Sequence, residues 1–271
     1  MNLKGRYTLI TGASAGLGRE MARDIAKRFG GNLVLVARRR DRLEELAKEL
    51  EGLGVEAVCI TADLSKPEDV ERLLREATDG RDIYAAILNA GVTYFGRHLE
   101  LPRETAQSIL ATNVHSVIEL ANGFVRHQLD KQLGGGVLVV SSMAGTVPTP
   151  YQALYSGTKA MLNTWGVAFG EELVGTNVSL SVFCPGGIAT EMGEKSGTAR
   201  KYKKGDVGMM DADVCARSAV DGFVARKRFN VPGVLYKLSD FFARFAPRGV
   251  LASVQANIFK GALLPEGQKQ S

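Results

Sequence analysis

The hydrophobic positions of this chain form short, dense runs that alternate with longer stretches of helical periodicity. The runs lie at residues 7–10, 33–36, 55–60, 83–88, 137–140 and 177–183. Dense apolar runs of this length are typical of strands buried on both faces, and the amphipathic stretches between them are typical of helices. The alternation predicts an α/β fold, a doubly wound parallel sheet with helices on both faces.

The length of 271 residues is enough for one large core, so we expect a single domain over residues 1–271. Residues 191–210 are polar and basic, which fits either a substrate lid or a solvated loop. Residues 211–227 predict a helix, and residues 229–235 predict a final edge strand.

The C-terminal extension, residues 234–260, begins with an amphipathic pattern. Its apolar residues recur at helical spacing: Val234, Leu235, Leu238, Phe241, Phe242 and Phe245. Lys237, Asp240 and Arg244 fall on the other side. We expect this helix to pack on the core. A dimer contact, a wall of the substrate site and a peripheral membrane contact are the alternatives.

Glycines follow the first predicted strand and open a helix. Gly12 permits a tight turn, while Gly16 and Gly18 let the backbone approach a pyrophosphate at the helix N-terminus. Ser14, Ala15 and Leu17 lie between these glycines and belong to the same candidate phosphate site. The alternative is a helix start that merely contains glycines.

The second strand ends without an acidic residue, and Arg38 follows it. In dinucleotide-binding folds an acid at this place binds the ribose 2′-hydroxyl, whereas an arginine accommodates a 2′-phosphate. The sequence therefore favours NADP(H) over NAD(H). The alternative is that Arg38 and its neighbours only solvate the start of a helix.

Two further strands end in polar residues or glycine. Asp63 and Leu64 follow the third strand, where the carboxylate could bind an adenine amine or serve as a turn residue. The segment Asn89-Ala90-Gly91 follows the fourth strand. There Gly91 would let the backbone pass close to a cofactor, and Asn89 could instead cap the strand end.

The second half of the chain carries candidate acid–base chemistry. Ser142 follows the fifth strand, and Tyr155 and Lys159 are four residues apart on a predicted helix face. An ammonium beside a phenol lowers the pKa of the phenol, which makes it a usable proton donor and acceptor. Asn113 interrupts an apolar helical stretch and requires a polar partner or a kink. Each residue also has a structural alternative, as a cap, a kink or a chance pair.

The glycine turn, Arg38, Asp63, Asn89–Gly91 and Ser142 all follow predicted strands, at the edge of an open parallel sheet where ligands bind. In this order they resemble the short-chain dehydrogenase/reductase family, in its compact single-domain branch. The resemblance covers residues 4–190 and rests on the glycine turn, Asp63, Asn89–Gly91, Asn113, Ser142, Tyr155, Lys159, Pro185, Gly186 and Thr190. Leu88 departs from the pattern, because the family usually has asparagine there.

The resemblance implies a Rossmann-type fold and a role for each residue. Tyr155 would exchange a proton with the substrate oxygen, Ser142 would donate to that oxygen, and Asn113 would hold a water linked to Lys159. Lys159 and Tyr155 would also contact the cofactor. After the sixth strand, Pro185 and Gly186 would contact the NADP(H) cofactor, and Thr190 and the backbone near Ile188 would bind its carboxamide.

Composition excludes several other classes. The net charge of +5 is modest, and the scattered basic residues form no nucleic-acid motif. Three distant cysteines and three histidines give neither a disulfide framework nor metal-ligand spacing, so no metal is expected. We see no run long and apolar enough for a transmembrane span, and no signal peptide. We expect a cytoplasmic protein, with homodimers or homotetramers implied by the resemblance through helices 103–132 and 155–174.

The sequence therefore predicts an NADP(H)-dependent oxidoreductase that interconverts a small-molecule carbonyl and a secondary alcohol. The apolar tail favours a bulky or apolar ketone or a 3-oxoacyl-type substrate. One alternative is a catalytically silent NADP-binding regulator on the same fold, which the complete Ser142–Tyr155–Lys159 set disfavours. A sugar-nucleotide epimerase is disfavoured by the short region after Thr190.

Overall fold

The protein is built on a seven-stranded parallel sheet with the strand order β3-β2-β1-β4-β5-β6-β9. The computed structural model describes residues 1–188, 209–261 and 263. The strands are β1 (Tyr7–Thr11), β2 (Asn32–Ala37), β3 (Ala57–Thr61), β4 (Ile83–Leu88), β5 (Gly136–Val140), β6 (Ser179–Phe183) and β9 (Phe229–Asn230). The predicted doubly wound α/β fold, of Rossmann type, is confirmed.

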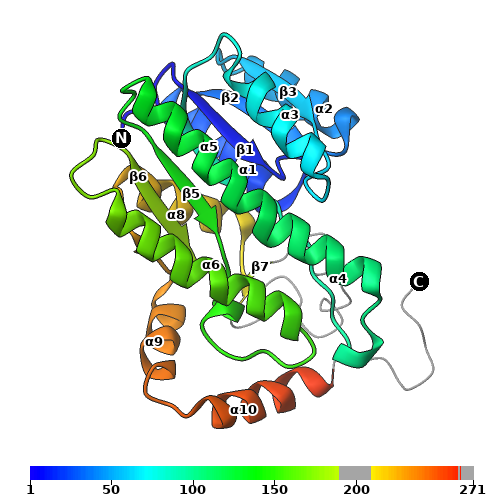
Figure 1. Cartoon of the computed structure of the whole chain (residues 1–271). Coiled ribbons are helices and arrows are strands. Elements are labelled where there is room, and N and C mark those ends of the chain that lie inside the picture. The colour runs from blue at the N-terminus through cyan, green and yellow to red at the C-terminus, as the bar shows by residue number, and fades with distance from the viewer. Residues whose placement is uncertain (189–208, 262, 264–271) are drawn as a thin grey trace.

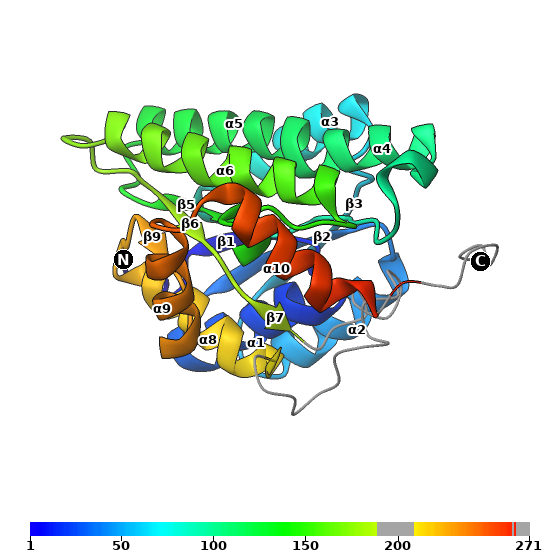
Figure 2. The same cartoon turned by 90° about the horizontal axis from the view of Figure 1, so that it is seen from below.

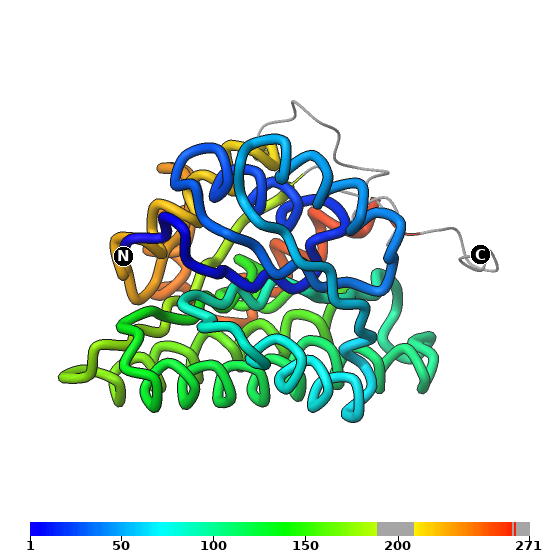
Figure 3. The backbone as a smooth tube through the Cα atoms, turned by 90° about the horizontal axis from the view of Figure 1, so that it is seen from above, coloured from blue at the N-terminus to red at the C-terminus, as the bar shows by residue number. Residues whose placement is uncertain are grey.

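Helices cover both faces of this sheet, as Figures 1 and 2 show. One layer holds α3 (Pro67–Thr78), α4 (Arg103–Leu110), α5 (Ser116–Asp130) and α6 (Ala153–Glu172). The other holds α1 (Gly16–Phe29), α2 (Arg40–Glu51) and α8 (Ala212–Val224). Figure 3 shows the same layers from the opposite end of the sheet.

The dense apolar runs arise because each strand contributes side chains to two hydrophobic cores, one on each face of the sheet. Leu33 and Leu35 of β2 point into the core beside α1 and α2, whereas Val34 and Val36 point into the core beside α3 and α5. Successive side chains of a strand alternate between faces, so a sheet covered on both sides needs apolar residues at every position. Most polar side chains of the sheet therefore stand at strand ends, and Thr8 in β1 and Ser181 in β6 are buried exceptions.

The predicted interruption at Asn113 is confirmed and has a defined form. Residues Ala111–His115 form a π-helical turn between α4 and α5, and the N–H of Ser116 bonds back to the carbonyl of Ala111. Such turns insert one extra residue into a helix and occur frequently at functional sites. Here the turn directs the Asn113 side chain into the protein, where it is fully buried.

The C-terminal part corrects two expectations. The final strand, β9, spans only Phe229–Asn230, and the chain then turns into α9 (Val234–Ala243) and α10 (Arg248–Lys260). The apolar residues of α9 point outward, with Val234 73% and Phe242 65% exposed, whereas Asp240 is buried. The prediction that this apolar face packs on the core is therefore wrong. Tyr236 and Asp240, one turn apart, lie on the inward side instead.

The helices α9 and α10, which we call the C-terminal arm, lie across the carboxyl end of the sheet (Figures 1 and 2). A short two-stranded ladder, β7 (Gly187–Ile188) with β8 (Met209–Met210), lies nearby. The predicted lid, residues 191–210, lies outside the described residues except for Met209 and Met210.

Candidate active site at the carboxyl edge of the sheet

The glycine turn after β1 leaves the N-terminus of α1 open toward the edge. Gly12 has a φ of +70°, and a Cβ on Gly18 would come within 2.4 Å of the Gly12 carbonyl oxygen. Ala15 is the N-cap of α1 and supplies no side-chain cap, and the first turn carries no acidic residue. The first N–H groups of α1 therefore have no side-chain acceptor at the N-cap, as an anion site requires. Leu17 anchors this turn in the core.

The three arginines after β2 have different surroundings. Arg38 is exposed, and Arg40 bonds to Glu44 along its own helix at 2.7 Å. Arg39 turns toward the glycine turn and donates to the Ser14 hydroxyl at 3.1 Å. Sequence reasoning singled out Arg38 and missed Arg39, although both follow the same strand end.

Asp63 has local partners, whereas Asn89 bonds to the glycine turn. The Asp63 carboxylate accepts from the backbone N–H and the hydroxyl of Ser65 through one oxygen, as a turn residue does. Asn89 donates its side-chain amide to the Thr11 carbonyl at 3.0 Å, which ties the end of β4 to the glycine turn. Leu64 is buried beside this region. The contacts of Asp63 match the turn alternative stated for it.

The Thr11 hydroxyl was not anticipated as a site residue. It accepts from the backbone N–H groups of Asn89 and Ala90, at 2.9 and 3.0 Å. The hydroxyl thereby fixes the backbone that leads to Gly91. A Cβ on Gly91 would lie 3.4 Å from the Asn113 side-chain oxygen and 3.7 Å from the Lys159 Nζ. Gly91 thus keeps open the space beside the Lys159 ammonium.

Asn113 holds the segment after β4. Its side-chain oxygen accepts from the Val92 N–H and its amide donates to the Val92 carbonyl, both at 2.9 Å. The amide also lies 3.3 Å from the Thr158 hydroxyl on α6. The side chain is therefore occupied, and any water-binding role falls to the backbone of the π-helical turn.

Ser142, Tyr155 and Lys159 converge at the end of β5. Lys159 is buried, donates to the Val140 carbonyl at 2.9 Å, and lies with its Nζ 5.8 Å from the centre of the Tyr155 ring. The Ser141 hydroxyl donates to the Lys159 carbonyl at 3.0 Å. Ser142 accepts from the Ala144 N–H and also forms a hydrogen bond with Tyr155. The fold therefore brings the three predicted groups together.

Burial dominates the electrostatics of this cluster. It raises the pKa of Tyr155 above its ordinary value, and the hydrogen bond with Ser142 partly opposes that rise in pKa. Burial lowers the pKa of Lys159 to about 8, because an ammonium loses its hydration there. Lys159 bonds to Val140 in this arrangement, and the pKa of Tyr155 is raised, whereas the i, i+4 spacing alone predicts a lowered pKa.

The segment after β6 is fixed by a residue that the motifs did not indicate. Tyr236, on the inward side of α9, accepts from the Gly187 N–H at 2.8 Å. A Cβ on Gly186 would overlap the Tyr236 ring. Pro185 accepts from the Met143 N–H, which joins this segment to the Ser142 loop. Ile188 pairs with Met210 in the small ladder, and Thr190 lies outside the described residues.

Aromatic side chains pack on one side of Tyr155. Phe95 contacts Tyr151 with ring centres 6.3 Å apart, and it contacts Phe259 of α10 at 6.0 Å. Tyr151 adopts a φ of +67°, which is unusual for a residue with a side chain and is often found at functional sites. A small hollow beside Tyr155 is lined on this side by Tyr94, His98, Leu101, Ile109 and Tyr151. The substrate side of the edge is therefore largely apolar and aromatic.

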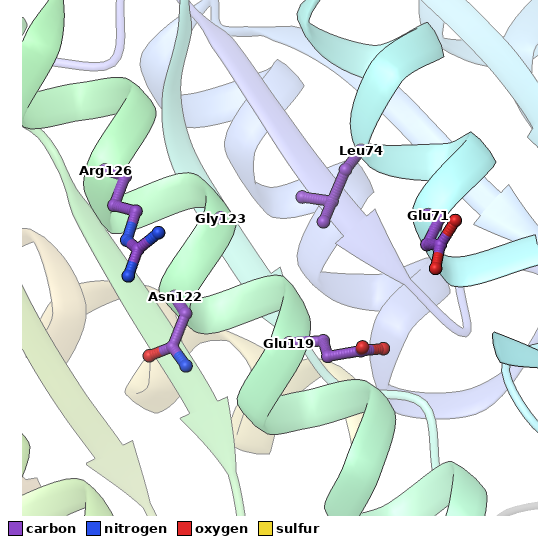
Figure 4. A pocket seen from close by; sticks show the side chains of 6 residues that line it. All are labelled: Glu71, Leu74, Glu119, Asn122, Gly123 and Arg126. Atoms are coloured by element: carbon purple, nitrogen blue, oxygen red, sulfur yellow. The ribbon is translucent and has the colours of Figure 1, made fainter. Parts of the chain in front are cut away.

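A larger hollow lies elsewhere, between α3 and α5. Figure 4 shows its lining, Glu71 and Leu74 on one side and Glu119, Asn122, Gly123 and Arg126 on the other. Its volume is about 260 Å³, but it lies on the outer helical layer and contains none of the candidate site residues.

Within residues 1–188, 209–261 and 263, no group of three His, Cys, Asp or Glu side chains could hold a metal ion. In the same residues, no helix is both long and apolar enough to cross a membrane.

The residues at the carboxyl edge fit a nicotinamide dinucleotide. The N-terminus of α1 is suited to the pyrophosphate, and Gly12 and Gly18 leave no room for side chains where the backbone must approach it. The space left by Gly91 lies beside the Lys159 Nζ and the Asn113 side-chain oxygen. A parallel sheet with these features defines a class of dinucleotide-binding folds.

Comparison with known proteins identifies the family within this class. A family model described as short chain dehydrogenase matches residues 6–201. The chain therefore belongs to the short chain dehydrogenase family.

Individual relatives agree with this assignment. A very-long-chain 3-oxoacyl-CoA reductase of Neurospora crassa is 36% identical over 194 residues, which cover 70% of this chain and 58% of the relative. The chain spans about half the length of the first curated relatives that it matches. A solved 7β-hydroxysteroid dehydrogenase has a TM-score of 0.82 at 26% identity, covering 94% of this chain and all of that one. An alcohol dehydrogenase from Thermococcus sibiricus, complexed with 5-hydroxy-NADP, has a TM-score of 0.75 at 29% identity over 85% of this chain and 97% of that one.

Proposed function

We propose that this protein is an NADP(H)-dependent oxidoreductase that interconverts a carbonyl and a secondary alcohol. The observation that carries the proposal is the convergence of Ser142, Tyr155 and Lys159 beside the open glycine turn. A protein that only binds a nucleotide has no need of a phenol hydrogen-bonded to a serine hydroxyl next to a buried ammonium.

The chain's own residues would hold the cofactor from one end of the edge to the other. The turn from Gly12 to Gly18 and the N-terminus of α1 would bind the pyrophosphate, and Asp63 with Leu64 would contact the adenine. Asn89, Ala90 and Gly91 would border the ribose next to Lys159. Pro185, Gly186, Ile188 and Thr190 would bind the carboxamide. The bound nicotinamide supplies or accepts the hydride.

Tyr155 would perform the proton chemistry. In reduction its hydroxyl gives a proton to the substrate oxygen, and in oxidation it takes that proton. Ser142 would donate a hydrogen bond to the same oxygen as charge develops on it. Lys159 would hold the ribose and, once its ammonium turns from Val140, would favour the phenolate of Tyr155. Asn113 would support this arrangement through Val92 and through a water on its backbone.

The choice of NADP(H) rests on the end of β2. No acidic residue follows this strand, and Arg38 and Arg39 both lie there, with Arg39 directed at the glycine turn. Two guanidinium groups suit a 2′-phosphate. This strand end has no carboxylate that could accept from a free ribose 2′-hydroxyl. The related alcohol dehydrogenase complexed with 5-hydroxy-NADP supports the same choice.

The substrate would be a bulky or apolar ketone or a 3-oxoacyl compound. Tyr94 and Tyr151 form an aromatic border in the hollow beside Tyr155. The buried Phe95 contacts both Tyr151 and Phe259 of α10, which crosses the carboxyl edge nearby. The relatives named for very-long-chain 3-oxoacyl-CoA and for hydroxysteroid substrates support this class. Small polar ketones would leave this border exposed to water and gain little from it.

We further propose that residues 1–271 act as one domain, in a cytoplasmic homodimer or homotetramer joined through α4, α5 and α6. Partly exposed apolar residues on these helices, among them Leu110 and Met161, support an interface there.

The test is a carbonyl panel with the full chain and NADPH, followed by loss of reduced-cofactor absorbance. The panel contains long-chain 3-oxoacyl thioesters, polycyclic ketones and small polar ketones. We expect turnover of the first two groups and weak turnover of the last. Tyr155→Phe removes only the hydroxyl, so kcat should fall at least about 1,000-fold while NADPH binding stays within a factor of two.

The outcomes separate the alternatives. NADPH binding without turnover of any carbonyl or alcohol would favour the silent regulator. Turnover that survives Tyr155→Phe would contradict the assigned proton donor. Turnover restricted to small polar ketones would contradict the proposed substrate class but leave the reaction type intact.

A further inference from the structure

The outward face of the C-terminal arm is an exposed apolar surface. On α9 and just beyond it, Val234, Leu238, Phe241 and Phe245 recur at spacings of three and four residues and form one helical stripe, joined by Leu235 and Phe242. Phe245 is 74% exposed, and the Phe241 ring contacts the Phe242 and Phe245 rings at 5.6 and 5.3 Å. Val250 and Val254, one turn apart on α10, extend the exposed apolar surface.

This orientation is fixed by polar contacts on the inner side of the arm. Tyr236 bonds to the Gly187 N–H, and the buried Asp240 accepts from Arg244 at 2.7 Å. Rotating α9 to bury the phenylalanines would pull the Tyr236 hydroxyl away from the Gly187 N–H and would turn the buried Asp240 toward solvent together with Arg244. The apolar stripe is therefore an outward surface that the fold maintains.

The charges of the arm are almost all positive. Between residues 234 and 261 the basic residues are Lys237, Arg244, Arg248 and Lys260, and the single acid is Asp240, which is buried and paired. With 3.6 residues per turn, Lys237 and Arg244 lie along one flank of the apolar stripe. Exposed phenylalanine and leucine with basic residues at their flank are the composition of helices that lie in the surface of an anionic bilayer.

A second copy of the chain fits this surface less well. A twofold interface would place the same patch against itself and bring the basic residues of two copies together without acids to balance them. Anionic lipid headgroups supply the missing negative charge, and the acyl region accepts the rings.

We propose that the outward face of the C-terminal arm docks on the surface of an anionic lipid bilayer. The rings of Phe241, Phe242 and Phe245 insert at the boundary between headgroups and acyl chains, and Lys237 and Arg248 contact the headgroups. This proposal stands apart from the proposed reaction, since it concerns only the outer side of α9 and α10. It would bring the aromatic border near Tyr155 close to a surface in which apolar compounds dissolve.

The experiment is vesicle flotation with the full chain at 0.1 M salt. One vesicle type contains phosphatidylcholine only. In the other, about 30% of the phosphatidylcholine is replaced by phosphatidylserine, which gives a strongly anionic surface. We expect binding to the anionic vesicles at least tenfold tighter than to the neutral ones, and weaker binding at 0.5 M salt.

Variants separate the two contributions. The triple variant F241S/F242S/F245S should weaken binding about 100-fold or more, because the inserted rings are lost. The variant K237Q/R248Q should weaken it about 25-fold, at roughly fivefold for each basic side chain. The matched control L99S/V174S removes exposed apolar side chains elsewhere and should bind as the wild type does. Circular dichroism and NADPH binding verify the fold, and F242S alone serves if the triple variant fails to fold.

Three outcomes would overturn the proposal. The wild type could fail to float with either vesicle type, the phenylalanine variant could bind as tightly as the wild type, or neutral and anionic vesicles could bind equally. Loss of a dimer in the phenylalanine variant, measured by light scattering, together with no vesicle binding by the wild type, would assign this face to a contact between two copies.

Discussion

The Ser142–Tyr155–Lys159 cluster and the C-terminal arm lie at the same edge of the sheet, but they are built in opposite ways. The cluster places polar groups in an apolar interior, and each has a partner within the chain, as Lys159 has in Val140. The arm places apolar groups in solvent, while two of its polar side chains, Tyr236 and Asp240, face inward.

The difference shows how much each region depends on its surroundings. A buried polar group costs free energy unless it is bonded, so the cluster is held in one geometry by the chain itself. An exposed apolar stripe gains free energy only when something outside the chain covers it. Substitutions in the cluster should therefore change chemistry and stability, and substitutions on the arm should change association.

Lys159→Met should produce the largest effect, because it should lower the activity of the protein and raise its thermal stability. We expect kcat/KM to fall by about 100-fold or more, because the ribose and the phenolate lose their ammonium. Since the pKa of Lys159 is lowered to about 8, burying its charge costs up to roughly 3 kcal/mol. After about 1 kcal/mol for the lost hydrogen bond, Tm of the cofactor-free variant should rise by about 3–6 °C at pH 7.

The pH dependence of this stabilisation has a definite sign. Below about pH 8 the folded protein carries the buried ammonium and bears its full cost. Between that pH and the ordinary pKa of lysine the unfolded chain binds more protons, so the wild type gains stability as pH rises. The Tm difference should therefore shrink from pH 8 to pH 10.5. A difference that stays constant over this range would show that the Lys159 charge is not the cause.

Asn113→Ala should mainly affect stability. It leaves the Val92 N–H and carbonyl without their side-chain partner, so the free energy of unfolding should fall by about 2 kcal/mol in urea titrations. Asn113→Asp is the matched control, because it can still accept from Val92 but cannot donate. If both variants unfold at the wild-type urea concentration, the Val92 contact contributes nothing.

Arg39→Ala should change the choice of cofactor. Arg39 is the arginine directed at Ser14, so its removal should raise KM for NADPH about 10- to 30-fold and leave KM for NADH nearly unchanged. Arg38→Ala tests the exposed neighbour in the same way, and Arg40→Ala is the control because Arg40 bonds to Glu44. Equal changes for NADPH and NADH would contradict a 2′-phosphate contact.

Tyr236→Phe should produce the smallest of these effects and tests whether the arm reaches the site. The ring remains against Gly186, but the Gly187 N–H loses its acceptor. We expect KM for NADPH to rise about fivefold with kcat within a factor of two, as for a positioning residue. A purely structural role would instead lower Tm and leave KM for NADPH at the wild-type value.

Much of the fold could be predicted because strands buried on both faces leave an unambiguous pattern. Val34 and Leu35 point to opposite cores, so both must be apolar, and β2 is visible in the sequence. The direction of the apolar face of α9 could not be predicted. Periodicity shows that a helix has two faces, but the contact of Tyr236 with Gly187, 49 residues away in sequence, determines which face of α9 turns inward.

The candidate site divides in the same way. Ser142, Tyr155 and Lys159 could be predicted from the sequence, because a strand end and a helical spacing bring them together. Arg39 and Tyr236 were missed for different reasons. Arg39 differs from Arg38 only in the direction of its side chain, and Tyr236 reaches Gly187 from a helix 49 residues away in sequence. Contacts between distant segments leave no local signal.

The π-helical turn at Ala111–His115 has a mechanical consequence. One extra residue rotates the following helix by about 100° about its axis, so the turn changes which face of α5 continues the buried face of α4. It lets one nearly continuous rod follow two surfaces, with α4 against α6 and α5 against α3 and the sheet. Deleting a single residue there would restore a regular helix and rotate Ile109 out of its buried position. The rod would then match one surface or the other, but not both.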